Sequence, residues 1–165
     1  MQLGDFFDYK NTLMEDLLTT ESIVKLIDED IDLEQAPSLS WKLVYPLEYI
    51  PDTVEHGHTF ICFDVDVQRA INKTYLLPTL FVWVFTHRSK IRLPEGGVRV
   101  DKICNEIAKK INGSRNYGLG ELDLTSVKRF APLKDFSGKV MMFTAKEFNR
   151  MYDPTKPIPN NRKGR

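Results

Sequence analysis

Thr79-Leu-Phe-Val-Trp-Val-Phe-Thr86 is the most apolar and β-prone segment of the chain. Because it is apolar on both faces, it predicts a central strand, buried on both sides or packed on one side and covered by a partner on the other. Upstream, residues 59–67 alternate, with Cys62, Asp64 and Asp66 on one face and apolar residues or threonine on the other. This alternation predicts a half-exposed strand.

Downstream, an unbroken apolar stripe predicts a helix over about 99–112, made of Val100, Ile103, Cys104, Ile107 and Ile111. The turn signal Pro94-Glu-Gly-Gly97 precedes this helix, and Asn112-Gly113 ends it. Two further strands are expected, one over 122–130 with an irregularity near Ser126, and one over 139–144 started by Gly138.

The N-terminal part predicts one long or two short helices over residues 12–30. Thr12-Leu-Met-Glu15 has the form of a capping box, the apolar residues behind it fall at helical spacing, and a break is expected near Thr19-Thr20. We expect the acids of this segment to face outward. Residues 31–58 are rich in proline, with a short strand expected over 41–45 and an ordered loop or edge segment over 46–51.

Together these elements predict an α+β fold with an antiparallel or mixed sheet packed against one central helix, about 99–112, and an N-terminal helical segment. One domain is expected over residues 1–150, because 165 residues is close to the usual size of a single domain. Residues 151–165 are expected to form an extended, Pro-rich basic tail.

Composition narrows the class of protein further. The chain is 42% hydrophobic and 28% charged, which is ordinary for a globular protein, and its two cysteines are too few for a disulfide framework. We therefore expect a soluble protein of a reducing compartment, without a secretory signal. The longest apolar run, 75–85, is about half the ~20 residues that a membrane helix needs, so no membrane association is expected.

The formal net charge is zero but unevenly spread. Residues 1–36 hold ten acids against two lysines, a balance of −8, and the remainder therefore holds +8. Such asymmetry is typical of subunits that associate head to side, with the acidic face of one copy against the basic face of the next. The plainer interpretation is that an acidic solvated helix and a basic tail fall at opposite ends, for solubility alone.

Candidate chemistry centres on the 59–67 strand, where His58, Asp64, Asp66 and Cys62 share one parity and His56 is near. Alternate positions on a strand lie ~6.6 Å apart, so this row alone does not make a tetrahedral metal site, and solvated aspartates are the plainer interpretation. No P-loop, GxSxG or HExxH motif is present in the sequence. We therefore predict no catalytic, metal-binding or cofactor-binding residues.

Basic residues are the remaining candidates. Arg88, Lys90 and Arg92 alternate just after the central strand, Arg99 opens the next helix, and Arg162, Lys163 and Arg165 close the chain. Contacts with the phosphates of DNA in a channel are one option. A protein interface or a solvated face is favoured, because aromatic residues are not interleaved for base stacking. The first four are candidate subunit-interface residues, and the last three are candidate contacts made by the tail.

Several stretches of the sequence resemble small proteins that are encoded among the structural genes of phages and prophages. They are Tyr49-Ile-Pro-Asp-Thr53, Thr59-Phe-Ile-Cys-Phe-Asp-Val-Asp-Val67, Val84-Phe-Thr-His87, Gly118-Leu-Gly120 and Gly138-Lys-Val-Met-Met-Phe143. Their order over about residues 10–150 resembles tail-terminator and tail-completion proteins, the head–tail joining proteins of tailed-phage necks. The Pro-rich 31–58 segment and the basic tail have no counterpart in that pattern.

The resemblance implies a virion protein, assembled in the host cytoplasm, that forms a ring, commonly of six copies, at the head-proximal end of the tail. Its partners would be further copies of itself, the tail tube protein and the head–tail connector protein. One alternative is another connector adaptor or stopper. A second, from a different class, is a metal-dependent nucleic-acid enzyme that uses His58, Asp64 and Asp66.

Overall fold

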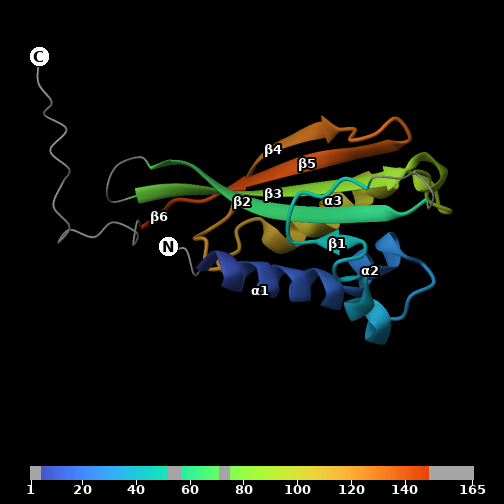
Figure 1. Ribbon diagram of the computed structural model, residues 1–165, viewed down its shortest axis with the longest axis horizontal. Coiled ribbons are helices and arrows are strands. Elements are labelled where there is room, and N and C mark those ends of the chain that lie inside the picture. The colour runs from blue at the N-terminus through green and yellow to red at the C-terminus, as the bar shows by residue number, and fades with distance from the viewer. Residues whose placement is uncertain (1–4, 52–56, 71–74, 149–165) are drawn as a thin grey trace, which may run out of the picture.

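A mixed β-sheet with α-helices on one side organises the chain, as Figure 1 shows for the computed structural model. The structure describes residues 5–51, 57–70 and 75–148. The expected tail, 151–165, lies outside this range. Within it the chain forms the single α+β domain that the sequence predicts.

Six strands make up the sheet of the described residues: β1 (Val44–Tyr45), β2 (Thr59–Ala70), β3 (Tyr75–His87), β4 (Asp123–Phe130), β5 (Phe136–Thr144) and β6 (Glu147–Phe148). Their order is β1-β2-β3-β5-β4, and β6 pairs with the start of β3. β1 runs parallel to β2 and every other pair is antiparallel, so the sheet is mixed. The predicted central strand is confirmed, since β3 lies between β2 and β5.

Three α-helices pack on this sheet: α1 (Asp5–Thr19), α2 (Glu21–Ile27) and α3 (Arg99–Ile111). Two 3₁₀ turns, η1 (Leu33–Leu39) and η2 (Arg88–Lys90), complete the described elements. The predicted helix over 99–112 is therefore confirmed almost to the residue. Its neighbour Gly113 has a φ of 75°, the left-handed conformation in which glycine commonly follows a helix.

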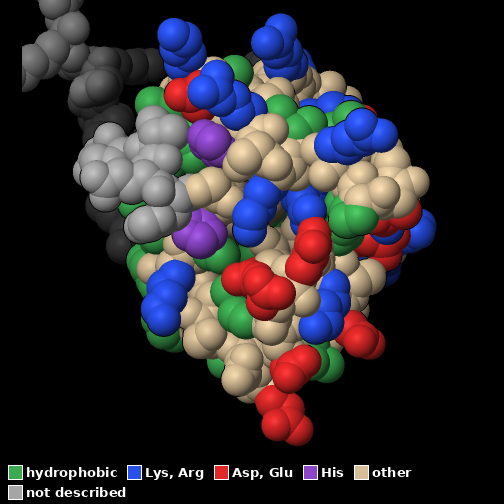
Figure 2. All heavy atoms as spheres, turned by 90° about the vertical axis from the view of Figure 1, so that its right-hand side faces the viewer, with side chains coloured by type: hydrophobic (Ala, Val, Ile, Leu, Met, Phe, Trp, Pro, Cys, Tyr) green, Lys and Arg blue, Asp and Glu red, His purple; other side chains and the backbone are tan. Residues whose placement is uncertain are grey.

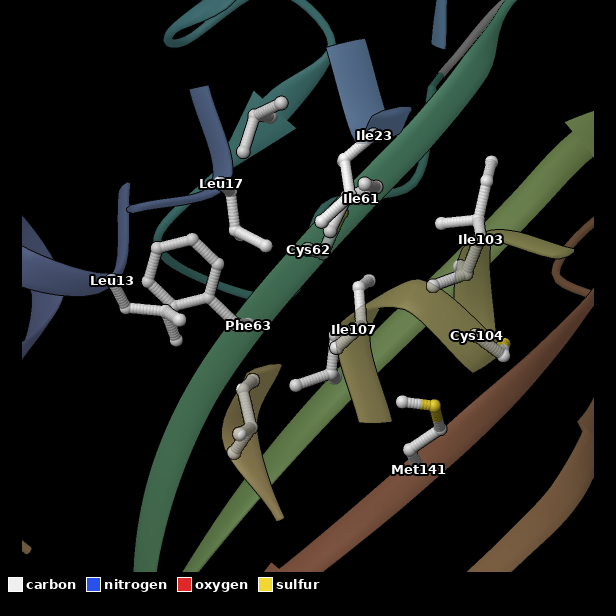
Figure 3. Close-up of a cluster of buried hydrophobic side chains, with 14 of the residues drawn as sticks. Leu13, Leu17, Ile23, Ile61, Cys62, Phe63, Ile103, Cys104, Ile107 and Met141 are labelled. Carbon is white, nitrogen blue, oxygen red and sulfur yellow. The ribbon is translucent and has the colours of Figure 1, made fainter. Parts of the chain in front are cut away.

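The core lies between the sheet and the helices. Val82 of β3 pairs with Phe63 on one side and Met141 on the other, and all three are fully buried. Ile103 and Ile107 of α3 point into the same cluster, together with Leu13 and Leu17 of α1 (Figure 3). Burial of each such side chain contributes about 1.5–3 kcal/mol, which is why the apolar stripe dictates how α3 docks.

The N-terminal helices differ from the prediction in where they begin. α1 begins at Asp5 rather than Thr12, and the Thr12 hydroxyl donates to the carbonyl of Asp8 inside the helix, so the expected capping box is wrong. The predicted break is confirmed, because α1 ends at Thr19 and α2 begins at Glu21. Thr20 lies between them and its hydroxyl donates to the Asp16 carbonyl at 2.6 Å. Local side-chain hydrogen bonds of this kind compete with the helical backbone pattern.

The second face of the sheet is partly covered by the chain itself. Residues 46–51 cross it, and the thiol of Cys62 donates to the Tyr49 carbonyl at 3.6 Å, so Cys62 is buried although the alternation of the strand places it on the face of the exposed Asp66. Phe60 stacks on Phe85 with ring centroids 5.2 Å apart. Further along β3, Phe81 and Trp83 remain partly exposed. The central strand is therefore buried on both faces at residues 78–80 and 84–86, and partly exposed on one face between them.

Strands β4 and β5 follow the prediction with one shift of boundary. The register of β4 changes between Leu124 and Ser126, which confirms the expected irregularity. β5 begins at Phe136, so Gly138 lies inside the strand rather than at its start. A Cβ atom on Gly138 would lie 2.3 Å from the carbonyl oxygen of Val84 and 2.7 Å from the Cα of Phe85. Glycine is needed there for the close approach of two strands.

Candidate interaction surfaces

A basic hollow lies where β3 ends and the β4–β5 hairpin turns. The backbone N–H of Arg88 donates to the Asp135 carbonyl at 2.8 Å, and its guanidinium meets the Asp135 carboxylate at 3.1 Å. These contacts hold η2 beside the hairpin around a hollow of about 420 Å³. Its charged lining residues are Arg88, Arg129, Lys134 and Asp135, three cations and one anion. We call this surface the basic hollow; it suits an acidic group of a partner.

The same end of the molecule also carries acids. Figure 2 views this end face and shows mainly Lys and Arg in its upper part and mainly Asp and Glu along its lower margin. In Figure 1 the segment that follows α2 lies at this end of the molecule, and it carries five carboxylates within seven residues: Asp28, Glu29, Asp30, Asp32 and Glu34. We call this segment the acidic margin. Charge is therefore separated in space on this face as well as along the sequence.

The predicted subunit-interface residues divide into two groups. Arg88 and Arg92 are exposed and Lys90 is half-buried, so all three lie where a partner can reach them. Arg99 is only 4% exposed, which corrects its placement at a surface. The tail residues Arg162, Lys163 and Arg165 lie outside the described residues.

Arg99 instead ties three elements together. Its Nε donates to the Lys90 carbonyl and its Nη1 to the Leu26 carbonyl, each at 2.8 Å, and its Nη2 meets the Glu29 carboxylate. The guanidinium has five N–H donors in a fixed fork, which explains how one side chain satisfies acceptors from α2 and from the η2 loop. Its role is to hold α3 against these two segments.

Some N-terminal acids also point inward, which corrects the expectation that all face solvent. The Asp16 carboxylate accepts a hydrogen bond from the Tyr117 hydroxyl at 2.8 Å and pairs with Lys110 at 3.6 Å. Burial, and then the hydrogen bond to Asp16, raises the pKa of Tyr117, so its hydroxyl stays protonated and donates. Only part of the charge on residues 1–36 is free to meet a partner.

The row of candidate metal ligands does not converge. Asp64 pairs with Lys10 at 3.0 Å and accepts a hydrogen bond from the Tyr9 hydroxyl at 3.3 Å, while Asp66 is exposed. Among the described residues no three His, Cys, Asp or Glu side chains lie close enough to hold a metal ion. His58 lies at the start of β2, where it borders a hollow with Phe60 and Tyr49. His56 lies outside the described residues.

Both cysteines are buried and free. Burial raises the pKa of the Cys62 and Cys104 thiols to about 12 from the ordinary value of 9. The thiolate is the nucleophilic form, so neither residue is activated for chemistry near neutral pH. They serve as small apolar residues of the core.

An exposed apolar groove, which the sequence did not reveal, runs along helix α1. Two adjoining hollows of about 240 and 500 Å³ share Asn11, Met14 and Ser40. Four large apolar side chains at the groove are exposed: Phe7 (70%), Trp41 (60%), Leu33 (42%) and Leu47 (37%). We call this surface the α1 groove. It could not be predicted because its two walls, α1 and the Pro-rich 31–58 segment, meet only in the folded protein.

The fold and these surfaces define a small α+β protein whose distinctive surface features are the basic hollow, the acidic margin and the α1 groove. The family model YomW matches residues 16–145, and the chain belongs to the YomW family. The family name points to a phage-derived protein, in agreement with the broader part of the resemblance, but not to a neck or tail role. A search of curated proteins finds no match. None of the helices in the described part of the chain is long and apolar enough to cross a membrane.

Proposed function

We propose that the chain is a structural protein of the phage virion, assembled in the host cytoplasm. Copies of it form a ring at the head-proximal end of the tail, where the ring terminates the tail tube and joins it to the head connector. Support comes from the phage-derived family and from the resemblance in the order of elements to tail-terminator proteins. Its partners are further copies, the tail tube protein and the connector protein.

The observation that carries this proposal is the separation of charge on the end face. The basic hollow has three cations at its lining, and the acidic margin presents carboxylates at the other side of the same face. The basic hollow of one copy can meet the acidic margin of the next in a heterologous contact, which closes into a ring when the rotation between copies permits. A two-fold pairing of the same end face would also set acid against base, but it would stop at a dimer, so the number of copies in the assembly distinguishes the two arrangements.

Charge reversal tests the proposal. Arg88→Glu with Arg92→Glu places acids at and beside the basic hollow, and we expect it to weaken both self-association and co-sedimentation with tail tubes. The matched control is Lys42→Glu with Lys128→Glu, which changes net charge equally at two exposed lysines outside the hollow. Tail tubes must be present, because the ring is expected to close on them.

Salt dependence gives a second readout. Exposed charges are screened beyond about 8–10 Å at physiological ionic strength, so assembly of the wild type should weaken as salt rises. Unchanged assembly of the Arg88/Arg92 variant, with wild-type salt dependence, would contradict the charge contact. Binding to connector protein without any binding to tail tubes would instead indicate an adaptor or stopper.

A structural role requires no catalytic step by this chain. We therefore expect the pure protein, tested with divalent cations present, to leave DNA and RNA intact. Asp64→Ala with Asp66→Ala should leave assembly unchanged, because neither residue lines the basic hollow or belongs to the acidic margin. Hydrolysis of nucleic acid that this double variant abolishes would overturn the structural role in favour of a metal-dependent enzyme.

A further inference from the structure

We infer that the α1 groove binds the C-terminal segment of the same chain, residues 149–165. The Pro-rich 31–58 segment and the basic tail have no role in the tail-terminator resemblance, and this inference gives a role to both. It is independent of ring assembly, because a single chain in dilute solution suffices for it.

The groove has the chemistry of a site for an apolar, Pro-rich ligand. Phe7 and Met14 of α1 form one wall of the smaller hollow, and Trp41, Pro46 and Leu47 form the other. Aromatic walls are what Pro-rich ligands dock against, since the rigid ligand loses little conformational entropy on binding. Single exposed apolar residues are normal, whereas three exposed ones that line one hollow, Phe7, Trp41 and Leu47, mark an interaction site.

Trp41 is held outward by its backbone. Its φ of 59° lies in the left-handed region, which residues other than glycine, and bulky ones above all, rarely adopt. Its backbone N–H donates to the Val44 carbonyl at 2.9 Å. The indole is 60% exposed, and its ring contacts Tyr45 edge-on at 6.4 Å. Tyr45 in turn stacks on Tyr49 at 4.1 Å, so the exposed indole rests on a fixed aromatic support. Such strain at an exposed aromatic indicates a binding surface.

The charge at the groove selects a basic ligand. Glu15 lines the larger hollow, and the exposed acids Asp8, Glu34 and Glu48 are sequence neighbours of the lining residues Phe7, Leu33 and Leu47. By the same criterion there is one exposed lysine, Lys42, beside Trp41. Lys10, the lysine of the lining, is paired with Asp64 at 3.0 Å. A ligand that combines apolar side chains with positive charge is therefore complementary.

The sequence of residues 149–165 has this combination. It contains five basic residues (Arg150, Lys156, Arg162, Lys163 and Arg165) against a single acid, Asp153. Its apolar residues include Tyr152 and Ile158, and Pro154-Thr-Lys-Pro157 has the spacing that places two prolines on one face of a polyproline helix.

The end of the described chain lies within reach. Strand β6 ends at Phe148, which pairs with Tyr75 at the left end of the sheet in Figure 1, the same end at which α1 begins. Seventeen residues in a polyproline conformation extend about 50 Å, at about 3.1 Å per residue. Helix α1, with 15 residues, is about 22 Å long. The segment is therefore long enough to follow the whole groove.

Disulfide trapping in the full-length chain tests the inference. Leu47→Cys with Ile158→Cys places one thiol at the groove and one in the segment, and the native cysteines are buried and do not compete. The control is Lys128→Cys with Ile158→Cys, which keeps the segment and moves the other thiol to an exposed position on β4. With oxidised glutathione, we expect the groove pair to close within one chain about tenfold faster than the control, because docking raises its effective concentration.

Quenching of Trp41 by acrylamide gives an independent readout. In a Trp83→Phe background Trp41 is the single tryptophan, and Tyr152→Ser with Ile158→Ser should raise its quenching constant about twofold, because the docked segment shields the exposed indole. Asn160→Ser with Asn161→Ser is the control within the segment and should leave quenching unchanged. Equal trapping rates for the two cysteine pairs would overturn the inference. A quenching constant of Trp41 that is unchanged by Tyr152→Ser with Ile158→Ser would also overturn it. Disulfides formed only between chains would overturn the intrachain assignment and place a neighbour's segment in the groove.

Discussion

Substitution of Arg99 distinguishes an effect on stability from an effect on assembly. The sequence predicts Arg99 as an interface residue, whereas the structure places it in the interior. We consider Arg99→Met, which keeps an apolar stem of similar length and removes the guanidinium. The change removes two 2.8 Å hydrogen bonds to the carbonyls of Leu26 and Lys90 and the ion pair with Glu29.

The magnitude follows from these contacts. A hydrogen bond from a charged group is worth about 1.5–3 kcal/mol, and a buried acceptor left without a partner costs a similar amount. The Glu29 side chain is 55% exposed, so its ion pair adds only about 0–1 kcal/mol. Allowing for relaxation and the packing that methionine retains, we expect a loss of about 3 kcal/mol in the free energy of unfolding. For a chain of this size that corresponds to a fall of about 6–12 °C in Tm.

Urea titration and thermal melting followed by circular dichroism measure this loss. Lys102→Met is the matched control, since Lys102 lies on the same helix with a half-exposed side chain and pairs with the exposed Glu95. We expect the control to shift the free energy of unfolding by less than about 1 kcal/mol. If Arg99→Met melted within a degree of the wild type but failed to assemble, Arg99 would act at an interface and our account of the α2–α3 contact would be wrong.

Three further predictions test the core. Ile107→Asp should unfold the domain, because it buries an unpaired carboxylate at a cost of several kcal/mol, whereas Asn105→Asp on the exposed side of α3 should melt like the wild type; equal melting of the two would refute the docking of α3. Gly138→Ala should lower the free energy of unfolding by about 3 kcal/mol or more, because its Cβ would meet the backbone of β3; unchanged urea stability would show that the strands can separate there. The rise in the pKa of Cys62 and Cys104 from 9 to about 12 lowers the thiolate fraction at pH 8 about a thousandfold. Both thiols should therefore react with a thiol reagent such as dithionitrobenzoate only after unfolding, and rapid labelling of the native protein at pH 8 would contradict their burial.

The elements with strong periodicity could be predicted from the sequence. The apolar stripe of 99–112 and the two-sided apolar run of 79–86 each have one compatible burial pattern, so α3 and the central place of β3 follow from them. The change of register near Ser126 was also predicted, because the apolar alternation of that strand slips there.

What could not be predicted depends on contacts between distant segments. In the sequence, Arg99 has the pattern of an exposed cation in the first turn of a helix. Its burial depends on the Leu26 and Lys90 carbonyls, which meet it only in the folded protein. Cys62 has the parity of the exposed Asp66, but residues 46–51 cover it. The α1 groove combines side chains from two segments that are each unremarkable in sequence, and the left-handed Trp41 carries no local signal such as glycine.

Electron microscopy of tail tubes mixed with the purified chain at low salt tests whether the chain terminates them. A ring-forming terminator predicts a closed ring of copies seated at one end of each tube, the head-proximal end, and tubes that no longer elongate when more tail tube protein is added. The Arg88→Glu, Arg92→Glu variant should leave the tube ends bare, while Lys42→Glu, Lys128→Glu should still cap them. Tubes with bare ends that go on growing at every concentration of the wild-type chain would contradict the claim.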